Sequence, residues 1–321
     1  MLRFAGGRLV QMLVSVWVAI TLIFIAVTQL PGDPVRALFG FRPPPAELYD
    51  QIAHRFGLDR PLGEQYWMYL SNTLTGDLGY SYPLDGWGAA KHGPAVTDTI
   101  AAAAPVSAIL IAGSLALQIV FGVGIGALGA LRGRRALVAG VYGLAVLLVA
   151  TPVLVAAYLL RTTLGVTLRW FPMNGVHDGA MSYVLPIIAL SALSIGYIIL
   201  LTRTEVRETL AAPFLKAARG RGYTTARLLT VHAMRPSLIP VVAFIAANIG
   251  QLFVGLIIVE GVFGLPGVGG AVFEAIRDRD RSLLIGLVTV FILVTLVLNT
   301  LADMLIAVID PRVRAATVPQ G

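Results

Sequence analysis

Six long apolar windows constrain the fold of this 321-residue chain more than any other feature. An α-helix needs about 20 mostly apolar residues to cross the roughly 30 Å hydrocarbon core of a bilayer, and each window is long enough. Backbone polar groups in lipid must be paired within their own segment, so we expect the windows to be helices. The windows are residues 9–30, 106–131, 136–160, 183–202, 237–259 and 283–309.

Charge is scarce, and this excludes most classes of soluble protein. Charged residues make up 13% of the chain and hydrophobic residues 57%, whereas an average soluble domain has about 25% charged residues. A soluble protein this apolar would expose large hydrophobic patches. The chain is therefore predicted to be an integral membrane protein. It has no cysteine, which excludes disulfides and thiolate chemistry.

The net charge of +7 would suit nucleic-acid binding, but its distribution indicates membrane orientation instead. One set of alternating segments holds 14 of the 24 Lys and Arg residues and three acids; the other set holds ten basic and 13 acidic residues. Because basic residues favour the cytoplasmic side, both termini are expected in the cytoplasm. The cation-rich segments are residues 1–8, 132–135, 203–236 and 310–321.

The longest segment on the external side, residues 31–104, is expected to have structure of its own. Pro45 and Pro61 each favour the start of a short helix, and residues 76–94 are expected to form an irregular loop. Aromatic residues gather on the second helix. They either anchor it at the membrane surface or line a substrate entrance, and they include Tyr66, Trp67 and Tyr69.

Gly122 and Gly126 form a small-xxx-small pair in the second window. Such a pair lets another helix approach closely, although glycine is also common in membrane helices without this contact. The pair predicts close packing but does not identify the partner helix.

The cytoplasmic segment 203–236 is long and strongly cationic. Residues 204–212 and 214–221 suit two helices, because Pro213 is permitted at a helix start. This segment is predicted to fold as a helix, a short helix, a turn and a further helix.

Glycine and threonine set the expected ends of these helices. Gly220 and Gly222 are expected to end the short helix, and Thr224 or Thr225 is expected to cap the next one, which runs to about His232. Two interpretations are open. The short helix fits a groove on a soluble partner, or the basic loop touches anionic lipid.

Motifs for ATP binding, acyl transfer and metal coordination are missing. Neither lysine, Lys91 or Lys216, follows a glycine, so there is no G-x-x-x-x-G-K-[ST] phosphate loop. There is no G-x-S-x-G elbow, and the histidines lack metal-ligand spacing. Asp303, with Asn299 one turn before it, is the ionisable residue of the sixth window, and a proton relay would need more. The chain is predicted to be a conduit without its own energy source, and not an enzyme.

Short motifs follow one another in order along nearly the whole chain. They are Leu30-Pro31-Gly32-Asp33-Pro34, residues 56–61, Gln65-Tyr66, residues 76–79 with Ser81, residues 217–222, residues 232–235, Ile239-Pro240, residues 259–269 and residues 310–314. Each motif is weak alone, but their order and spacing are specific. Together they resemble the inner-membrane permease subunits of ATP-binding cassette (ABC) importers for dipeptides, oligopeptides and nickel.

The resemblance implies an all-α integral membrane protein with six transmembrane helices and the type I ABC importer permease fold. It places the first helix in residues 1–30, a small external segment in 31–104, helices 2–6 in 105–309 and a cytoplasmic tail in 310–321. Such permeases pair with a second, similar permease above two ATPase subunits that bind ATP and Mg²⁺. A lipid-anchored or periplasmic binding protein delivers the substrate. The chain itself is expected to need no cofactor.

The resemblance also identifies the segment 203–236 with the family's coupling loop, whose short helix fits a groove on the ATPase. Lys216 stands where the general pattern has Glu, as is common in the peptide group, and Gly220 stands where Ala is usual. The matching positions are Phe214, Lys216, Ala217, Ala218, Arg219, Gly220, Arg221, Gly222 and Tyr223.

The resemblance favours peptides as substrates, while near relatives carry nickel chelates, haem, glutathione or oligosaccharides. Two other classes of function are weighed against it. A secondary carrier predicts several buried ionisable residues or an internal repeat, and neither is evident. A membrane-anchored receptor predicts a larger external domain than residues 31–104 supply.

Overall fold

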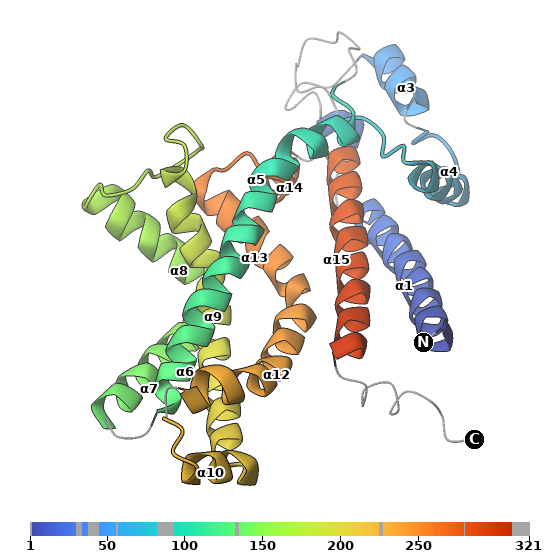
Figure 1. The fold of residues 1–321 in the computed structure, drawn as a ribbon. Helices are drawn as coiled ribbons and strands as arrows, with labels where there is room; N and C mark the ends of the chain where they lie inside the picture. The colour runs from blue at the N-terminus through green and yellow to red at the C-terminus, as the bar shows by residue number, and fades with distance from the viewer. Residues whose placement is uncertain are drawn as a thin grey trace. The chain divides into compact units, whose positions relative to one another are not determined.

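The computed structural model describes residues 2–29, 34–37, 45–55, 57–81, 93–131, 135–224, 227–278 and 280–309. Throughout these residues the regular structure is helical (Figure 1), and the one β-bridge joins Tyr80 and Ala95. The predicted all-α class is therefore confirmed for the described part of the chain. The exit at residues 30–33, the possible cap Thr225 and the tail 310–321 lie outside it.

Five helical segments are long and apolar enough to cross a bilayer, and up to seven are counted if two bent helix pairs each form one span. In the first pair, α7 (Arg135–Ala150) is bent by 102° from α8 (Val153–Leu160) and the segment η2 (Arg161–Thr167) that continues it. The label η denotes a π-helical segment. Pro152 has an extended backbone at this break. The window 136–160 therefore contains a sharp bend. The five segments are Gly6–Ala26, Val96–Ala130, Met181–Ala211, Leu228–Ala247 and Ser282–Ala302, and the second pair is Ile249–Phe263 with Val268–Arg277.

The chain divides into two compact units. The first comprises Met1–Gly6, Ala108–Leu265 and Leu298–Gly321, and the second comprises Gly7–Ser107 and Pro266–Val297. The first unit holds α7, α8, η2, η1 (Gln118–Val123), α6 (Gly124–Ala130), α9 (Met181–Ala211), α10 (Pro213–Gly220), η3 (Leu228–Ala233), α12 (Met234–Ala247) and α13 (Ile249–Phe263). The second holds α2 (Pro34–Ala37), α3 (Ala46–Arg55), α4 (Leu62–Thr75), α14 (Val268–Arg277) and most of α1 (Leu2–Thr28) and α15 (Arg281–Ile309). Helix α5 (Val96–Leu117) begins in the second unit and ends in the first.

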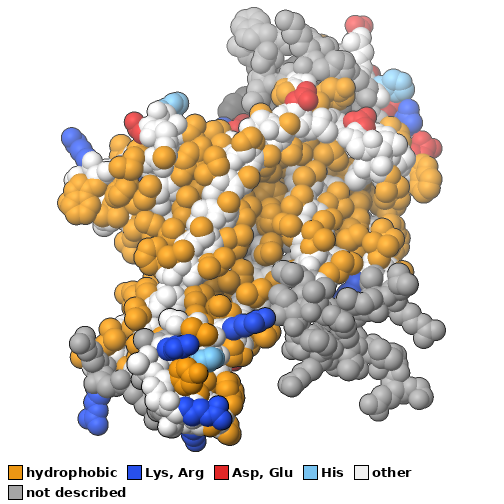
Figure 2. All heavy atoms as spheres, viewed as in Figure 1, with side chains coloured by type: hydrophobic (Ala, Val, Ile, Leu, Met, Phe, Trp, Pro, Cys, Tyr) orange, Lys and Arg blue, Asp and Glu red, His pale blue; other side chains and the backbone are white. Residues whose placement is uncertain are grey.

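Helix α9 forms the centre of the first unit. Of its most apolar window, 56% is buried, against 22% for Val96–Ala130 and for Leu228–Ala247. It packs against η1, α6, α7, α8 and α12. Apolar side chains cover much of the remaining surface (Figure 2), as expected for helices that face lipid.

Gly122 and Gly126 lie where α9 comes closest. A Cβ atom on Gly122 would lie 2.6 Å from Cγ2 of Ile198, and one on Gly126 would lie 2.8 Å from the carbonyl oxygen of Ile199. Both distances are too short for any side chain, so glycine is needed at both positions. The close packing predicted for this small-xxx-small pair is confirmed, and α9 is the partner.

The second apolar segment becomes helical earlier than its window indicates. Helix α5 begins at Val96 and carries Pro105 in its interior, which membrane helices tolerate where neighbouring groups satisfy the freed carbonyl. Val96 packs on Gly286 of α15, where an added Cβ would lie 2.6 Å from a Val96 methyl group. The helix therefore starts within the residues assigned to the external segment.

Side chains cap two helix starts in the second unit, and a residue distant in sequence takes part at each. Asp280 accepts the backbone N–H of Leu283 at 3.0 Å at the start of α15, and the Ser81 hydroxyl donates to Asp280 at 2.6 Å. The Ser107 hydroxyl accepts the backbone N–H of Val268 at 2.9 Å at the start of α14. These contacts satisfy N–H groups that have no partner within their helix.

The two helices predicted within residues 31–104 are present as α3 and α4. The Tyr66 hydroxyl lies 2.7 Å from the Thr21 hydroxyl of α1, and its ring meets Phe24 edge-on with 5.4 Å between centroids. Tyr69 stacks on Phe24 and forms a hydrogen bond with Thr289 of α15. Burial raises the pKa of Tyr69, because it disfavours the charged phenolate.

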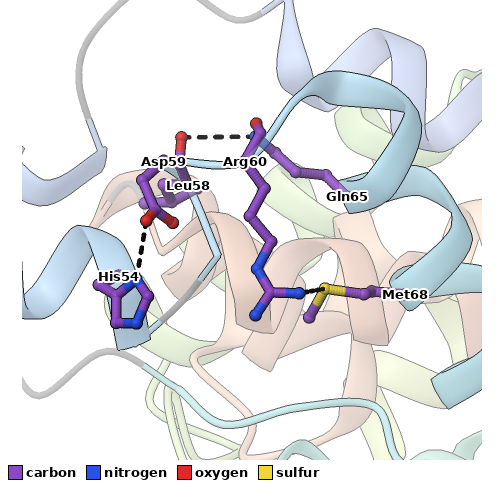
Figure 3. A network of polar contacts seen from close by, with 6 residues as sticks. All are labelled: His54, Leu58, Asp59, Arg60, Gln65 and Met68. Carbon is purple, nitrogen blue, oxygen red and sulfur yellow. Dashed lines mark hydrogen bonds and ion pairs between the residues drawn. The ribbon is translucent and has the colours of Figure 1, made fainter.

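A polar contact joins α3 to the turn that precedes α4 (Figure 3). Nδ1 of His54 lies 2.7 Å from a carboxylate oxygen of Asp59, with 75% and 43% of the two side chains exposed. The hydrogen bond with His54 holds the pKa of Asp59 below its ordinary value. The contact therefore favours the ionised carboxylate.

Acidification is expected to release this contact, and Asp59→Asn is expected to remove the pH dependence. Because the folded-state pKa of Asp59 is lowered, the contact stabilises the turn above the unfolded-state pKa and is lost as pH falls through the folded-state pKa. Both groups are exposed, so the effect is small and local. Hydrogen–deuterium exchange of residues 54–60 measures it, with Asp59→Asn at each pH as the reference. Identical exchange in the two proteins at neutral pH would contradict this expectation.

Candidate functional site

The candidate site is the short helix α10, which the sequence places in the cationic segment 203–236. Helix α9 runs through residues 204–211 without a break and ends at Ala211, and the backbone of the next residue, Ala212, is extended (φ −62°, ψ 146°). Pro213 forces this conformation on the residue before it and then starts α10. The backbone N–H groups of Leu215 and Lys216 donate to the Ala212 carbonyl, both at 3.1 Å.

The end of α10 is set by Gly222, which has a positive φ of +88°. The Tyr223 N–H donates to the Ala218 carbonyl at 3.4 Å, the six-to-one bond that marks a Schellman end. Gly220 is the last residue of the helix itself. The prediction that these two glycines end the short helix is confirmed, and the left-handed backbone lies at Gly222.

One face of α10 is held against its neighbours. Leu215 is 2% exposed and clusters with Leu228 and Ala233 of η3, and Leu210 and Ala218 pack against this cluster. Burial of such side chains stabilises by about 25 cal/mol per Å² of apolar surface. This cluster ties α10 both to the end of α9 and to the start of the following helix.

A hydrogen bond fixes the two helices that flank the segment. The hydroxyl of Ser237, 1% exposed, donates to the hydroxyl of Thr209 on α9 at 2.9 Å. The helix after the loop is continuous from η3 into α12, so it does not end near His232 as the sequence predicted. Together, the apolar cluster and this bond make the end of α9, α10 and η3 one packed element.

The opposite face of α10 is open. Phe214 is 58% exposed, and Lys216, Ala217, Gly220 and Arg221 are also exposed. Phe214, Ala217 and Arg221 follow one another at helical spacing on the same face. An aromatic ring beside two small residues, within a basic surface, offers a projection that a groove can receive. Figure 2 shows Lys and Arg side chains gathered around this part of the first unit.

Tyr223 extends this surface beyond the glycine turn. The Arg227 guanidinium lies 5.0 Å from the centroid of its ring, and the His232 ring meets it edge-on at 5.7 Å. The first distance is within the range of a cation–π interaction. The Arg227 backbone N–H also points to the Thr224 hydroxyl at 3.4 Å, in agreement with the predicted Thr224 cap.

The structure brings the predicted residues together in one helix and its turn, although the side chain of Arg219 lies outside the described part. Sequence reasoning missed the groups that hold the helix in place. An apolar pattern at residues 210, 215 and 218 is a signal for the buried face. No comparable signal exists for the bond between Thr209 and Ser237, because it depends on how two helices cross.

The described residues of α10 and its surroundings do not form a metal site. Across the described ranges, no three His, Asp or Glu side chains gather closely enough to hold one. Asn299, which the sequence singled out with Asp303, has a buried side-chain oxygen without a hydrogen-bond partner in the same part of the chain; the Asp303 side chain is not described there.

The sequence matches models for two parts of one kind of protein. The model of the binding-protein-dependent transport system inner membrane component matches residues 118–315, and the model of the N-terminal part of that component matches residues 1–110. The chain is 32% identical to the oligopeptide transport system permease protein of Salmonella typhimurium over 98% of this chain and 100% of that protein. It is 30% identical to the dipeptide transport system permease protein of Lactococcus lactis, with the same coverage. It is 31% identical to the glutathione transport system permease protein of Pectobacterium atrosepticum, covering 98% of this chain and 99% of the relative.

Proposed function

This chain belongs to the family of binding-protein-dependent transport system inner membrane components, and we propose that α10 couples it to a separate ATPase subunit. One observation carries the proposal. α10 is pinned on one face by Leu215 and presents an exposed Phe214 among cations on the other. A helix that lies on lipid binds through a continuous apolar face, whereas the exposed surface of α10 has one ring, Phe214, among Lys216, Ala217 and Arg221. The groove expected on the partner is apolar with an acidic rim.

The packing gives a route by which force reaches the membrane helices. α9 is 31 residues long, and α10 is joined to its end by the cluster around Leu215 and by the extended Ala212. Movement of α10 therefore carries the end of α9 with it. Because α9 packs against η1, α6, α7, α8 and α12, its displacement moves the helices around it. The transition exchanges outward-open and inward-open states.

In the proposed topology the chain crosses the bilayer six times, with both termini in the cytoplasm. The single residue Asn248 separates α12 from α13, and we count these two helices as one bent span. α7 and α8 likewise form the third span. The parts are then residues 1–30, the external segment 31–104, the core 105–309 with its coupling loop 203–236, and the tail 310–321. The excess of Lys and Arg in the loops on one side supports this orientation.

The proposed assembly has four kinds of component. A second, similar permease forms the other half of the path, two cytoplasmic ATPase subunits bind ATP and Mg²⁺, and an external binding protein brings the substrate. The absence of a phosphate-binding loop from this sequence supports an ATPase on separate chains. In this assembly the chain transports and does not catalyse.

Peptides are the proposed substrates. The relatives named above are permeases for oligopeptides, dipeptides and glutathione, and all three are chains of amino acids joined by amide bonds. A path for such molecules has to accept varied side chains. Selection then falls mainly to the external binding protein.

Two single cysteines test the orientation and the docking surface together. The chain has no native cysteine, so each introduced thiol is the only one present. In intact spheroplasts that lack the ATPase subunits, Asp50→Cys on α3 is expected to react with an impermeant maleimide, whereas Ala217→Cys on α10 is expected to react only after permeabilisation. In the assembled importer, Ala217→Cys is expected to be protected by the ATPase subunit and to cross-link to it.

Three outcomes would overturn the proposal. These are labelling of Ala217→Cys from outside, labelling of Asp50→Cys only after permeabilisation, or an assembled and active importer in which Ala217→Cys reacts as fast as in the isolated chain. Uptake of a radiolabelled dipeptide by spheroplasts that contain the assembled importer shows that each variant is functional.

A further inference from the structure

Helix α4 presents three different faces, and only one is explained by packing within the chain. Tyr66, Tyr69 and Thr73 follow helical spacing on the face that meets α1 and α15. A second face carries Trp67, Leu70 and Leu74, of which Trp67 and Leu74 are 68% and 77% exposed. The third face is mostly polar and exposed, and it carries Glu64, Ser71, Asn72 and Thr75 beside the partly buried Met68.

The contacts of α4 set its depth against the apolar segments. Tyr66 reaches Thr21, which lies within the membrane-crossing candidate Gly6–Ala26, and Tyr69 reaches Thr289 within Ser282–Ala302. Thr21 comes seven residues before the end of α1 at Thr28, or about 10 Å along a helix with 1.5 Å rise per residue. A helix tied at this depth lies beside the apolar surface of two spans.

We propose that α4 lies in the bilayer interface, with Trp67 and Leu74 among the lipid chains and the polar face toward water. Exposed Leu22 and Ile25 on α1, 61% and 49% exposed, continue the apolar surface from the span to α4. Tryptophan favours this boundary because its ring is apolar and its N–H seeks a polar partner. An amphipathic helix of this kind binds through its buried apolar area.

The cationic side chain of Arg60 lies at the start of α4. The Arg60 guanidinium donates to the Met68 sulfur at 3.2 Å, and the Gln65 amide donates to the Arg60 carbonyl at 2.7 Å (Figure 3). These contacts lay the exposed Arg60 side chain along the helix. Its charge can pair with a lipid phosphate while its stem covers apolar surface. A soluble protein is the less suitable occupant, because Tyr66 and Tyr69 hold the helix beside residues that belong to the spans.

Trp67 supplies its own probe for the test. A chain with Trp17, Trp87 and Trp170 replaced by Phe keeps Trp67 as its only tryptophan. The protein is reconstituted in phosphatidylcholine liposomes with bromine on the 6,7 or the 11,12 carbons of the acyl chain. We expect the shallow bromines to lower Trp67 fluorescence by about two-fold and the deeper ones to lower it less, because the interface lies roughly 5–10 Å into the boundary of the acyl chains. Aqueous iodide is expected to quench it weakly.

A variant that carries its single tryptophan at another position of α4 gives the matched control. Asn72→Trp, combined with Trp67→Phe in the same background, places the ring on the polar face of the same helix. It is expected to be quenched by iodide and hardly at all by bromolipid. If the triple Phe background fails to fold, the difference in fluorescence between the native chain and Trp67→Phe reports the same residue.

Strong iodide quenching of Trp67 with no effect of bromolipid would overturn the proposal. Protection of Trp67 from iodide only after the external binding protein is added would identify a protein-docking face instead. The inference requires that α1 and α15 cross a bilayer but not that the chain transports. Failure of the ATPase cross-link would therefore leave it standing, and its own failure would leave the coupling proposal unchanged.

Discussion

Gly126→Val is expected to remove most of the folded protein from the membrane. A Cβ atom at this position would lie 2.8 Å from both the Ile199 carbonyl oxygen and Cβ of Thr202. The first obstacle is backbone, so a change of rotamer cannot relieve it. Overpacking of a well-packed core costs about 1–3 kcal/mol, and this site adds the loss of contact along the central helix α9. Because native stability is typically only about 5–15 kcal/mol, the loss should be visible as reduced yield and a lower Tm.

The same substitution two residues earlier is the control. Gly124 belongs to the same helix α6, and an added Cβ there meets nothing within 4 Å. Gly124→Val is expected to stay within about 0.5 kcal/mol of the native protein, as surface changes usually do. Size-exclusion chromatography and thermal unfolding of the detergent-extracted proteins compare the two. Equal stability of the two variants would show that α6 does not pack against α9 as described.

The apolar windows could be predicted because bilayer thickness sets a length that hydropathy detects directly. The ends of the helices could not, since a helix needs no apolar residues once it leaves the lipid. α9 shows this: Arg203, Glu205 and Arg207 end the apolar window, yet the helix continues to Ala211. The bend between α7 and α8 has a cause that is visible in the sequence, which is Pro152. The break at Asn248 has no comparable signal, because a single Asn in an apolar run interrupts few helices.

Local chemistry also explains what could be predicted about the candidate site. Gly222 could be assigned to a helix end because glycine takes a positive φ with little strain. The bracing of α10 by Thr209 and Ser237 could not be predicted, since it depends on the crossing of α9 and α12. On α4 the sequence gives three aromatics equal weight. Only the contacts of Tyr66 and Tyr69 with α1 and α15 separate them from Trp67.

Gly222→Val is expected to uncouple ATP hydrolysis from peptide uptake while leaving membrane insertion intact. The backbone at this position has a φ of +88°, and an added Cβ meets nothing within 4 Å, so the cost comes from the backbone and not from crowding. For an L-residue the left-handed region costs roughly 1–2 kcal/mol, and a β-branched side chain suits it least. The Schellman end would therefore give way, and Tyr223 with Arg227 would leave the docking surface. Since about 1.4 kcal/mol is a factor of ten in population, we expect uptake per ATP hydrolysed to fall by about ten-fold.

Two further variants at the same turn separate backbone strain from loss of glycine as such. Gly222→Asn is expected to retain much of the coupling, because Asn tolerates a positive φ better than other residues. Gly220→Ala is expected to couple as well as the native chain, since Gly220 is helical with open space around it and alanine favours the helix by about 1 kcal/mol. Uptake and ATPase activity are measured in the same proteoliposomes, with the amount of assembled importer as the reference. Native coupling in Gly222→Val, or an equal loss in all three variants, would contradict the role given to this turn, because only the valine is incompatible with its backbone.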